Sequence, residues 1–194
     1  MNKNILLCGV GGQGTVLASK LIAQAAMNKD IPVMSAETIG MAQKGGSVFS
    51  YIRLGDDLFT PMIPLGSTDI IIGFEPAETV RVLPYLKKGG SVIVNSCITK
   101  PVTAMVADNA YSGEEMIQFL KKHVENLTIV DCNEASEKVG SAKTVNMILL
   151  GAALDTGEIP VSKEDVKEAV AKRVKTEFLE MNYKALDYVK NMKG

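Results

Sequence analysis

Residues 5–14 of this chain read ILLCGVGGQG, an apolar run followed at once by a glycine-rich loop. The run predicts a buried strand, and residues 15–27 predict a helix because their apolar members recur at helical spacing. Gly9, Gly11 and Gly14 therefore stand between a strand and a helix, where a G-x-G-x-x-G pattern binds phosphate. Glycines permit positive φ and close approach of backbone N–H groups, and the helix N-terminus adds partial positive charge. This stretch predicts an α/β fold with a phosphate-binding loop.

Strands and helices alternate along the rest of the chain. We predict one domain over residues 1–194, with a Rossmann-like, mostly parallel sheet flanked by helices and a helical C-terminal portion from about 141 to 194. Residues 55–57, Gly-Asp-Asp, predict the turn of a β-hairpin. The further predicted strands cover 31–36, 47–54, 58–63, 69–74, 91–94 and 127–131. The further predicted helices cover 75–88, ended by glycines 89 and 90, then 113–123, 141–155 and 163–192.

Composition excludes several classes of protein. The chain has 21 Lys and Arg against 22 Asp and Glu, a net charge of −1, which argues against a nucleic-acid-binding surface. Its longest apolar run, 147–154, is far shorter than the ~20 residues of a membrane span, so we expect a soluble, cytoplasmic protein. Three scattered cysteines and one histidine provide neither a disulfide framework nor the clustered ligands of a zinc or iron–sulfur site.

A second glycine loop follows the strand predicted at 31–36, where residues 37–47 read ETIGMAQKGGS. Loops that follow parallel strands meet at the carboxyl edge of a sheet, so both glycine loops and Glu75 are predicted to share that edge. Lys44 can bind a phosphate or carboxylate there, and Gln43 can hydrogen-bond it. Alternatively, Lys44 is a solvated loop residue, glycines 45 and 46 form a bulge, and Glu75 only stabilises its helix dipole.

Other functions stay open at this stage. The glycine loop, with Glu37 placed to reach a ribose hydroxyl, is also compatible with an autonomous NAD(P)-binding protein. No later segment supplies a hydride-transfer acid–base pair, because His123 lies on a charged helix and is expected at the surface. A third alternative is a scaffold whose glycine loop binds nothing. Asn146 lies in an otherwise apolar helix and is either a satisfied buried amide or a contact to a partner.

Three motifs occur in order, at residues 9–15 (GVGGQGT), 40–48 (GMAQKGGSV) and 74–76 (FEP). Together they resemble the gamma-type subunits of 2-oxoacid:ferredoxin oxidoreductases, and within that family the small (beta) subunits of the indolepyruvate type. The resemblance continues through residues 83–90 and 146–151 and weakens after about residue 155. The indolepyruvate type usually has His where Ile39 stands and Arg where Lys44 stands. Ile39 therefore lacks the hydrogen-bond donor of the histidine, and Lys44 offers a single point charge in place of the bidentate contact of an arginine.

This resemblance implies an oxidoreductase subunit of anaerobic metabolism that is inactive alone. Its large partner subunit would carry thiamine diphosphate, Mg and iron–sulfur clusters, and the complex would convert a 2-oxoacid and coenzyme A (CoA) to an acyl-CoA and reduce ferredoxin. The isolated chain is either monomeric or a homodimer. The gamma subunit of a pyruvate or 2-oxoglutarate enzyme is the alternative within the family.

The resemblance assigns no catalytic residue and no metal ligand to this chain. It implies that the two glycine loops and their neighbours line a composite site or contact a phosphate-bearing cofactor, either thiamine diphosphate or CoA. These residues are Gly9, Gly11, Gly12, Gln13, Gly14, Thr15, Glu37, Gln43, Lys44, Gly45, Gly46, Ser47 and Glu75.

Overall fold

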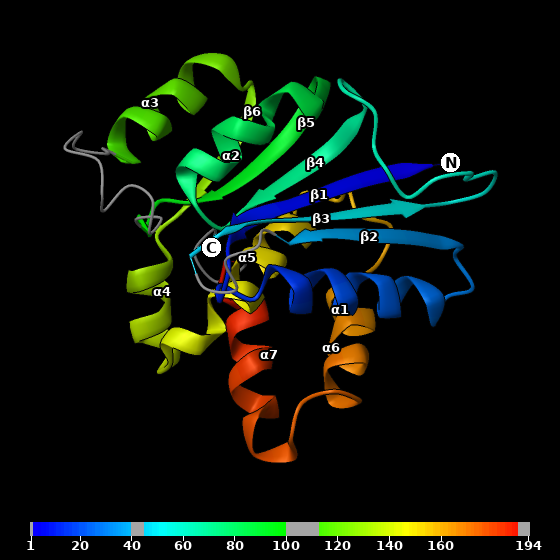
Figure 1. Cartoon of the computed structure of the whole chain (residues 1–194). Coiled ribbons are helices and arrows are strands. Elements are labelled where there is room, and N and C mark those ends of the chain that lie inside the picture. Colours follow the sequence, from blue (N-terminus) through cyan, green and yellow to red (C-terminus); the bar gives the residue numbers. More distant parts are fainter. Residues whose placement is uncertain (1, 40–44, 100–112, 190–194) are drawn as a thin grey trace.

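The computed structural model describes residues 2–39, 45–99 and 113–189. At its centre is a sheet of six strands, covered by helices on both faces (Figure 1). The strands are β1 (Lys3–Val10), β2 (Val33–Ile39), β3 (Ser47–Leu54), β4 (Thr68–Gly73), β5 (Leu86–Asn95) and β6 (Asn126–Val130). The α-helices are α1 (Thr15–Met27), α2 (Pro76–Val82), α3 (Gly113–His123), α4 (Cys132–Val139), α5 (Val145–Leu154), α6 (Lys163–Ala171) and α7 (Leu179–Asp187). The predicted α/β class is confirmed.

The sheet has the order β2-β3-β1-β4-β5-β6. Strands β1, β4, β5 and β6 pair in parallel, whereas β3 is antiparallel to both β1 and β2. The strand after α1 therefore does not lie beside β1, because β3 lies between them. This arrangement keeps β2 parallel to β1 in direction, so that both strands end at the same edge of the sheet.

The β-hairpin of the fold is the pair β2–β3, and its position differs from the prediction. Residues 58–63 form no strand after the turn at 55–57. Pro61 and Pro64 lack the N–H groups that a strand in a ladder donates, which explains why this segment crosses the end of the sheet as a loop. Its one buried anchor is Ile63, which is 3% exposed.

Each face of the sheet has its own apolar core. One core contains Ile5, Leu7, Ile70 and Ile72 from the central strands and packs against α1, α4, α5, α6 and α7. The other contains residues of alternate parity, such as Leu6 and Ile71, and packs against α2 and α3. The continuous apolar runs of β1 and β4 are thus explained by burial on both faces. Within the described ranges, no helix combines the length and the apolar character needed to span a bilayer.

The helix predicted from residue 75 is shorter than expected. Helix α2 ends at Val82, and residues 83–85 form a 3-10 turn, in which Pro84 has no N–H to continue the helical hydrogen bonds. Lys87 and Lys88 belong to β5 and not to a basic last helical turn. The Nζ of Lys87 makes an ion pair with Asp69 on β4, a pairing partner that the local pattern does not reveal.

The single helix predicted over residues 163–192 is two helices. Helices α6 and α7 pack against each other and are joined by residues 172–178, which contain a short 3-10 turn. Lys167 on α6 makes a 2.7 Å ion pair with Asp187 on α7, and the hydroxyl of Tyr183 donates to the backbone carbonyl of Lys167. The apolar spacing continues across the turn because both helices bury a face in the same core, so periodicity alone predicts one helix.

Candidate functional site

The first glycine loop ends in a helix N-terminus that no side chain caps. Gly12 and Gly14 have φ values of 104° and 86°, in the region that favours glycine. Gly14 is the N-cap residue of α1, makes no side-chain cap hydrogen bond and is followed by no acidic residue in the first turn. Helices α2, α4 and α6 instead begin with side-chain caps from Glu75, Asp131 and Ser162. The first N–H groups of α1 are therefore left for an outside acceptor.

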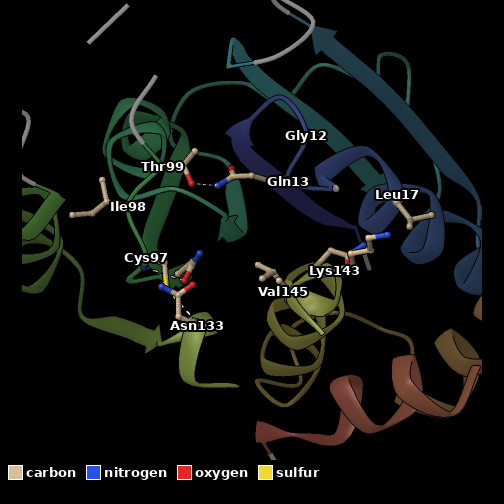
Figure 2. Close-up of a pocket in the computed structure, with 13 residues that line it drawn as sticks. Gly12, Gln13, Leu17, Cys97, Ile98, Thr99, Asn133, Lys143 and Val145 are labelled. Atoms are coloured by element: carbon tan, nitrogen blue, oxygen red, sulfur yellow. Dashed lines mark hydrogen bonds between the residues drawn. The ribbon is translucent and has the colours of Figure 1, made fainter. Parts of the chain in front are cut away.

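Gln13 closes the glycine loop on itself. Its Oε1 accepts a 2.7 Å hydrogen bond from the backbone N–H of Val10, and its Nε2 donates to the carbonyl oxygen of Phe74 at 3.2 Å. The same Nε2 donates to the hydroxyl of Thr99 at 3.1 Å (Figure 2). Because these bonds occupy both ends of the amide, Gln13 fixes the shape of the loop against the end of β4.

The second glycine loop lies against the first. The backbone N–H of Gly11 donates to the carbonyl oxygen of Gly46 at 2.8 Å, and Gly45, with φ of 79°, donates back to Gly11 at 3.5 Å. The two loops therefore share one edge of the sheet, as predicted from the sequence. Gln43 and Lys44 lie outside the described residues, so their predicted contacts stay predictions.

Two buried carboxylates lie beside this edge. Glu75 is fully buried and accepts hydrogen bonds from the backbone N–H groups of Ala77 and Glu78, so it caps α2. Glu78 is 2% exposed, accepts a hydrogen bond from the Ser47 hydroxyl and pairs with Arg81 at 3.4 Å. Ser47 and Glu78 thus hold the start of β3, where the second loop returns to the sheet.

Eight of the predicted site residues that the structure describes do not line the cavity beside the first glycine loop: Gly9, Gly11, Thr15, Glu37, Gly45, Gly46, Ser47 and Glu75. Gly9 is packed inside β1, where an added Cβ would lie 2.8 Å from the Cβ of Phe74. Thr15 is buried at the first position of α1. Glu37 is exposed on β2, opposite Ser50 of β3, and β3 separates it from the glycine loop. The structure therefore does not bring Glu37 to the position of a ribose-binding acid.

A cavity of about 490 Å³ opens beside the first glycine loop (Figure 2). Figure 2 shows Cys97 and Asn133 on one wall and Lys143 and Val145 on the facing wall. Of the predicted site residues, Gly12, Gln13 and Gly14 line it. The other lining residues were not predicted as site residues: Leu17, Asn95, Cys97, Ile98, Thr99, Asn133, Ala142, Lys143, Val145 and Asn146.

The residues that line this cavity favour an anionic ligand that also carries polar groups. Lys143 is the one charged residue among the described residues that line the cavity, and its Nζ has no partner within the described part of the chain. Asn146 is 6% exposed, and its Nδ2 would lie 3.1 Å from a Cβ placed on Gly14. The side chain of Asn146 accepts a hydrogen bond from the Met147 N–H, which leaves Nδ2 as a donor toward the loop.

Asn95 and Cys97 also line this cavity. The side-chain amide of Asn95 donates to the Phe74 carbonyl and accepts from the N–H groups of Cys97 and Cys132, so the fold uses its oxygen and one of its two N–H donors. Burial raises the pKa of the Cys97 thiol, and the neighbouring Asp131 carboxylate raises it further. Burial also raises the pKa values of Cys8 and Cys132. These thiols are therefore protonated near neutral pH and are weak nucleophiles.

Metal and hydride-transfer chemistry find no support in the described part of the chain. No group of three or more His, Cys, Asp or Glu side chains in residues 2–39, 45–99 and 113–189 is placed to hold a metal ion. The exposed His123 stacks on Phe119 with ring centroids 4.0 Å apart, and its Nδ1 contacts the Phe119 carbonyl at 2.8 Å. His123 is a surface residue, as predicted.

Sequence comparison assigns the chain to a class of proteins. The family model described as pyruvate ferredoxin/flavodoxin oxidoreductase matches residues 4–191, and the chain belongs to this family. The resemblance to oxidoreductase subunits that the three motifs carry is therefore confirmed. A relative from Pyrococcus horikoshii, named indolepyruvate oxidoreductase subunit IorB, is 37% identical over 186 residues, covering 95% of this chain and 92% of the relative.

Two solved structures have the same fold. The gamma subunit of a keto/oxoacid ferredoxin oxidoreductase from Geobacter sulfurreducens has a TM-score of 0.70 at 24% identity, covering 97% of this chain and 94% of that one. The 2-oxoglutarate:ferredoxin oxidoreductase from Magnetococcus marinus, solved with 2-oxoglutarate, coenzyme A and succinyl-CoA bound, has a TM-score of 0.71 at 17% identity. The match covers 98% of this chain and 31% of that one, so the same fold occurs there as part of a longer chain.

Proposed function

We propose that this chain is the small subunit of an indolepyruvate:ferredoxin oxidoreductase and forms a single domain of that complex. The 37% identity to an indolepyruvate oxidoreductase subunit over nearly its whole length supports this assignment. In the reaction, an aryl 2-oxoacid loses CO₂, its acyl carbon forms a bond to the sulfur of CoA, and the thiol proton is released. The two electrons set free reduce ferredoxin. The thiamine diphosphate, its Mg and the iron–sulfur clusters would belong to the large partner subunit.

We propose that this chain itself binds CoA, in the cavity beside the first glycine loop. Three features fit its phosphates: the uncapped N-terminus of α1, the unpaired Nζ of Lys143 and the donor Nδ2 of Asn146. Thiamine diphosphate fits less well, because Mg²⁺ binds through oxygen ligands such as carboxylates and no carboxylate is among the described lining residues. We therefore place a CoA phosphate at Gly12 and Lys143.

The residues of this chain would hold and orient CoA while its thiol accepts the acyl group at the partner's site. The N–H groups of the loop and of α1 would bind the phosphate, and Lys143 would add a compact positive charge. Gln13 would keep the loop in its binding shape through its bonds to Val10 and Phe74. Such positioning makes the acyl transfer effectively intramolecular.

Reconstitution tests the proposed function. The purified chain alone should be colourless and unable to oxidise any 2-oxoacid, and addition of the large subunit should allow viologen reduction by an arylpyruvate in the presence of CoA. Turnover of only pyruvate or 2-oxoglutarate would instead support a gamma subunit of another substrate type. Stoichiometric iron in the isolated chain would contradict the assignment of the clusters to the partner.

Calorimetry tests the alternative of an autonomous NAD(P)-binding protein. We expect weak or no binding of NAD(H), because Glu37 lies away from the glycine loop. A micromolar dissociation constant, about −8 kcal/mol, would support the dinucleotide alternative. The cytoplasmic location, ferredoxin as the acceptor and the possible homodimer stay predictions.

A further inference from the structure

The connection between β3 and β4 carries exposed apolar side chains. Phe59 is 91% exposed, more than any other large apolar residue in the described ranges, and Leu65 and Met62 are 67% and 47% exposed. Residues 58–68 read LFTPMIPLGST and contain no charged side chain. We call residues 58–65 the apolar loop. Apolar side chains that gather in this way on a protein surface mark an interaction site.

Hydrogen bonds and a buried anchor hold the apolar loop in one shape. Arg53 on β3 donates from Nη1 to the carbonyl oxygen of Thr60 at 3.0 Å, and Ile63 is buried in the core at 3% exposure. Just after the loop, the N–H of Gly66 donates to the carbonyl oxygen of Pro84 at 3.0 Å. The loop's own two prolines restrict its backbone further. Phe59 is thus presented to solvent by a preorganised loop, which reduces the entropy cost of burying it against a partner.

The apolar loop lies at the opposite edge of the sheet from the cavity beside the first glycine loop. Strand β3 ends at Leu54, which pairs with Lys3 at the start of β1, whereas the first glycine loop follows the other end of β1. Figure 1 shows the connection between β3 and β4 extending past the sheet on the side of the N-terminus. Residues 58–65 are all described, and none of them lines that cavity. A partner subunit that meets the cavity would thus leave the apolar loop free for another contact.

The two ends of the apolar loop carry opposite charges. Asp56 and Asp57 are exposed immediately before it. Beyond its other end, the segment that Gly66 contacts at Pro84 continues into β5, where Lys88 is exposed. These two aspartates and this lysine make no ion pair within the described part of the chain. An uncharged loop with one acidic and one basic end is complementary to a second copy of itself that runs in the opposite direction.

We propose that the apolar loop is an interface between two copies of this chain, related by a two-fold axis and with their loops antiparallel. Phe59 of each copy packs on the apolar loop of the other, and Asp56 of each copy faces Lys88 of the other. A two-fold axis brings the same surface of both copies together, so a charge near the axis would face its own like charge. The absence of charged residues from 58–68 fits this requirement. The inference does not depend on which ligand the cavity binds.

The experiment is sedimentation equilibrium on the full chain over a range of protein concentrations. We expect a monomer–dimer equilibrium, and Phe59→Ser should raise the dimer dissociation constant at least about tenfold because it removes the central apolar contact. Phe59 is 91% exposed in a single copy, so its loss should leave the fold intact, which circular dichroism checks. Phe178→Ser is the matched control, since Phe178 is 44% exposed in the turn between α6 and α7, outside the apolar loop. It should dimerise like the wild type.

Reversal of charge tests the antiparallel arrangement of the loops. Asp56→Lys and Lys88→Asp should each weaken the dimer by about threefold or more, since each places like charges opposite each other. The double variant should recover most of the lost affinity, because the pair forms again with reversed polarity. Additive losses in the double variant would overturn the antiparallel arrangement.

A chain that is monomeric at every concentration, or a dimer that Phe59→Ser does not weaken, would overturn the interface. If the chain is monomeric and Phe59→Ser prevents its binding to the large subunit, the apolar loop contacts that subunit and the proposal is wrong. Calorimetry with CoA separates these outcomes from the proposed function, because Phe59→Ser should bind CoA like the wild type whether or not the chain dimerises.

Discussion

The backbone N–H of Gly11 donates a 2.8 Å hydrogen bond to the carbonyl oxygen of Gly46. This bond joins two loops that are separated by helix α1 and strand β2 in the sequence. It extends the β1–β3 ladder, whose last pair is Val10 and Ser47. The sheet itself therefore positions the two loops. The first glycine loop is fixed by this bond to the residue before β3 and by the hydrogen bonds that its own Gln13 side chain makes with Val10 and Phe74.

Gly12→Val should weaken CoA binding by about tenfold or more. Gly12 has φ of 104°, and an added Cβ would meet no atom within 4 Å, so the side chain would project into open space at the cavity. The conformational cost for a valine is about 1–2 kcal/mol, which should leave the fold intact. Calorimetry with CoA measures the affinity, and circular dichroism checks the fold.

Gly157→Val is the matched control for this variant. Gly157 has φ of 73°, an added Cβ there also meets no atom within 4 Å, and it does not line the cavity. It should lose similar stability and bind CoA normally. If both variants bind CoA like the wild type, the glycine loop does not contact the ligand.

Lys143→Gln should raise the dissociation constant for CoA and reduce the dependence of binding on salt. The substitution removes the charge of the cavity wall and keeps a side chain of similar length. Lys138→Gln is the control, because Lys138 pairs with Glu134 on α4 and does not line the cavity. An unchanged affinity and salt dependence would exclude a phosphate contact. Lys44→Gln tests the predicted contact of the second loop in the same way.

Ser47→Ala should lower the free energy of unfolding by about 1–3 kcal/mol, since it removes a hydrogen-bond donor from the buried carboxylate of Glu78. Ser50→Ala in the same strand should be nearly neutral, because its buried hydroxyl has no partner in the described part of the chain. Urea denaturation measures both values. Equal losses for the two variants would show that the Ser47–Glu78 bond contributes nothing specific.

Ser162→Ala should destabilise the chain by about 1 kcal/mol, because Ser162 and Asp165 form a capping box at the start of α6. The pKa of Asp165 is lowered, first by the hydrogen bond from the backbone N–H of Ser162 and then by the Ser162 hydroxyl and Lys29. A lowered pKa means that the contribution is present above the unfolded value, about 3.9, and is lost as the pH falls through the folded value.

Asp165→Asn should therefore differ from the wild type in unfolding free energy between pH 7 and pH 5, and the difference should shrink below about pH 4. Glu164→Gln is the control, since Glu164 lies in the same first turn outside the capping box. A difference for Asp165→Asn that grows as the pH falls would contradict the sign.

Local sequence determined the elements whose signals are short-range. The strand, glycine loop and helix at residues 3–27 form as predicted, because the apolar run, the positive-φ glycines and the helical spacing act within a few residues. Helix α3 at Gly113–His123 also agrees with the prediction. The family resemblance carried by the three motifs gave the class of protein.

Tertiary structure decided the sheet order and most of the cavity. Nothing local places β3 between β2 and β1, yet that order separates Glu37 from the glycine loop. Likewise, the C-terminal segment divides into α6 and α7, which pack against each other in one core, and Lys87 lies in β5 with its Nζ paired to Asp69 of the adjacent strand.

Asn133, Lys143 and Asn146 illustrate why the sequence alone did not determine the site. Each lies more than a hundred residues after the glycine loop, in a segment whose local pattern shows only a helix start or an apolar helix. All three line one cavity with Gly12 and Gly14, because α4 packs on α5, and α5 packs on α1, β4 and β5. A local pattern specifies which residues form a helix, whereas the residues it faces depend on packing between distant segments.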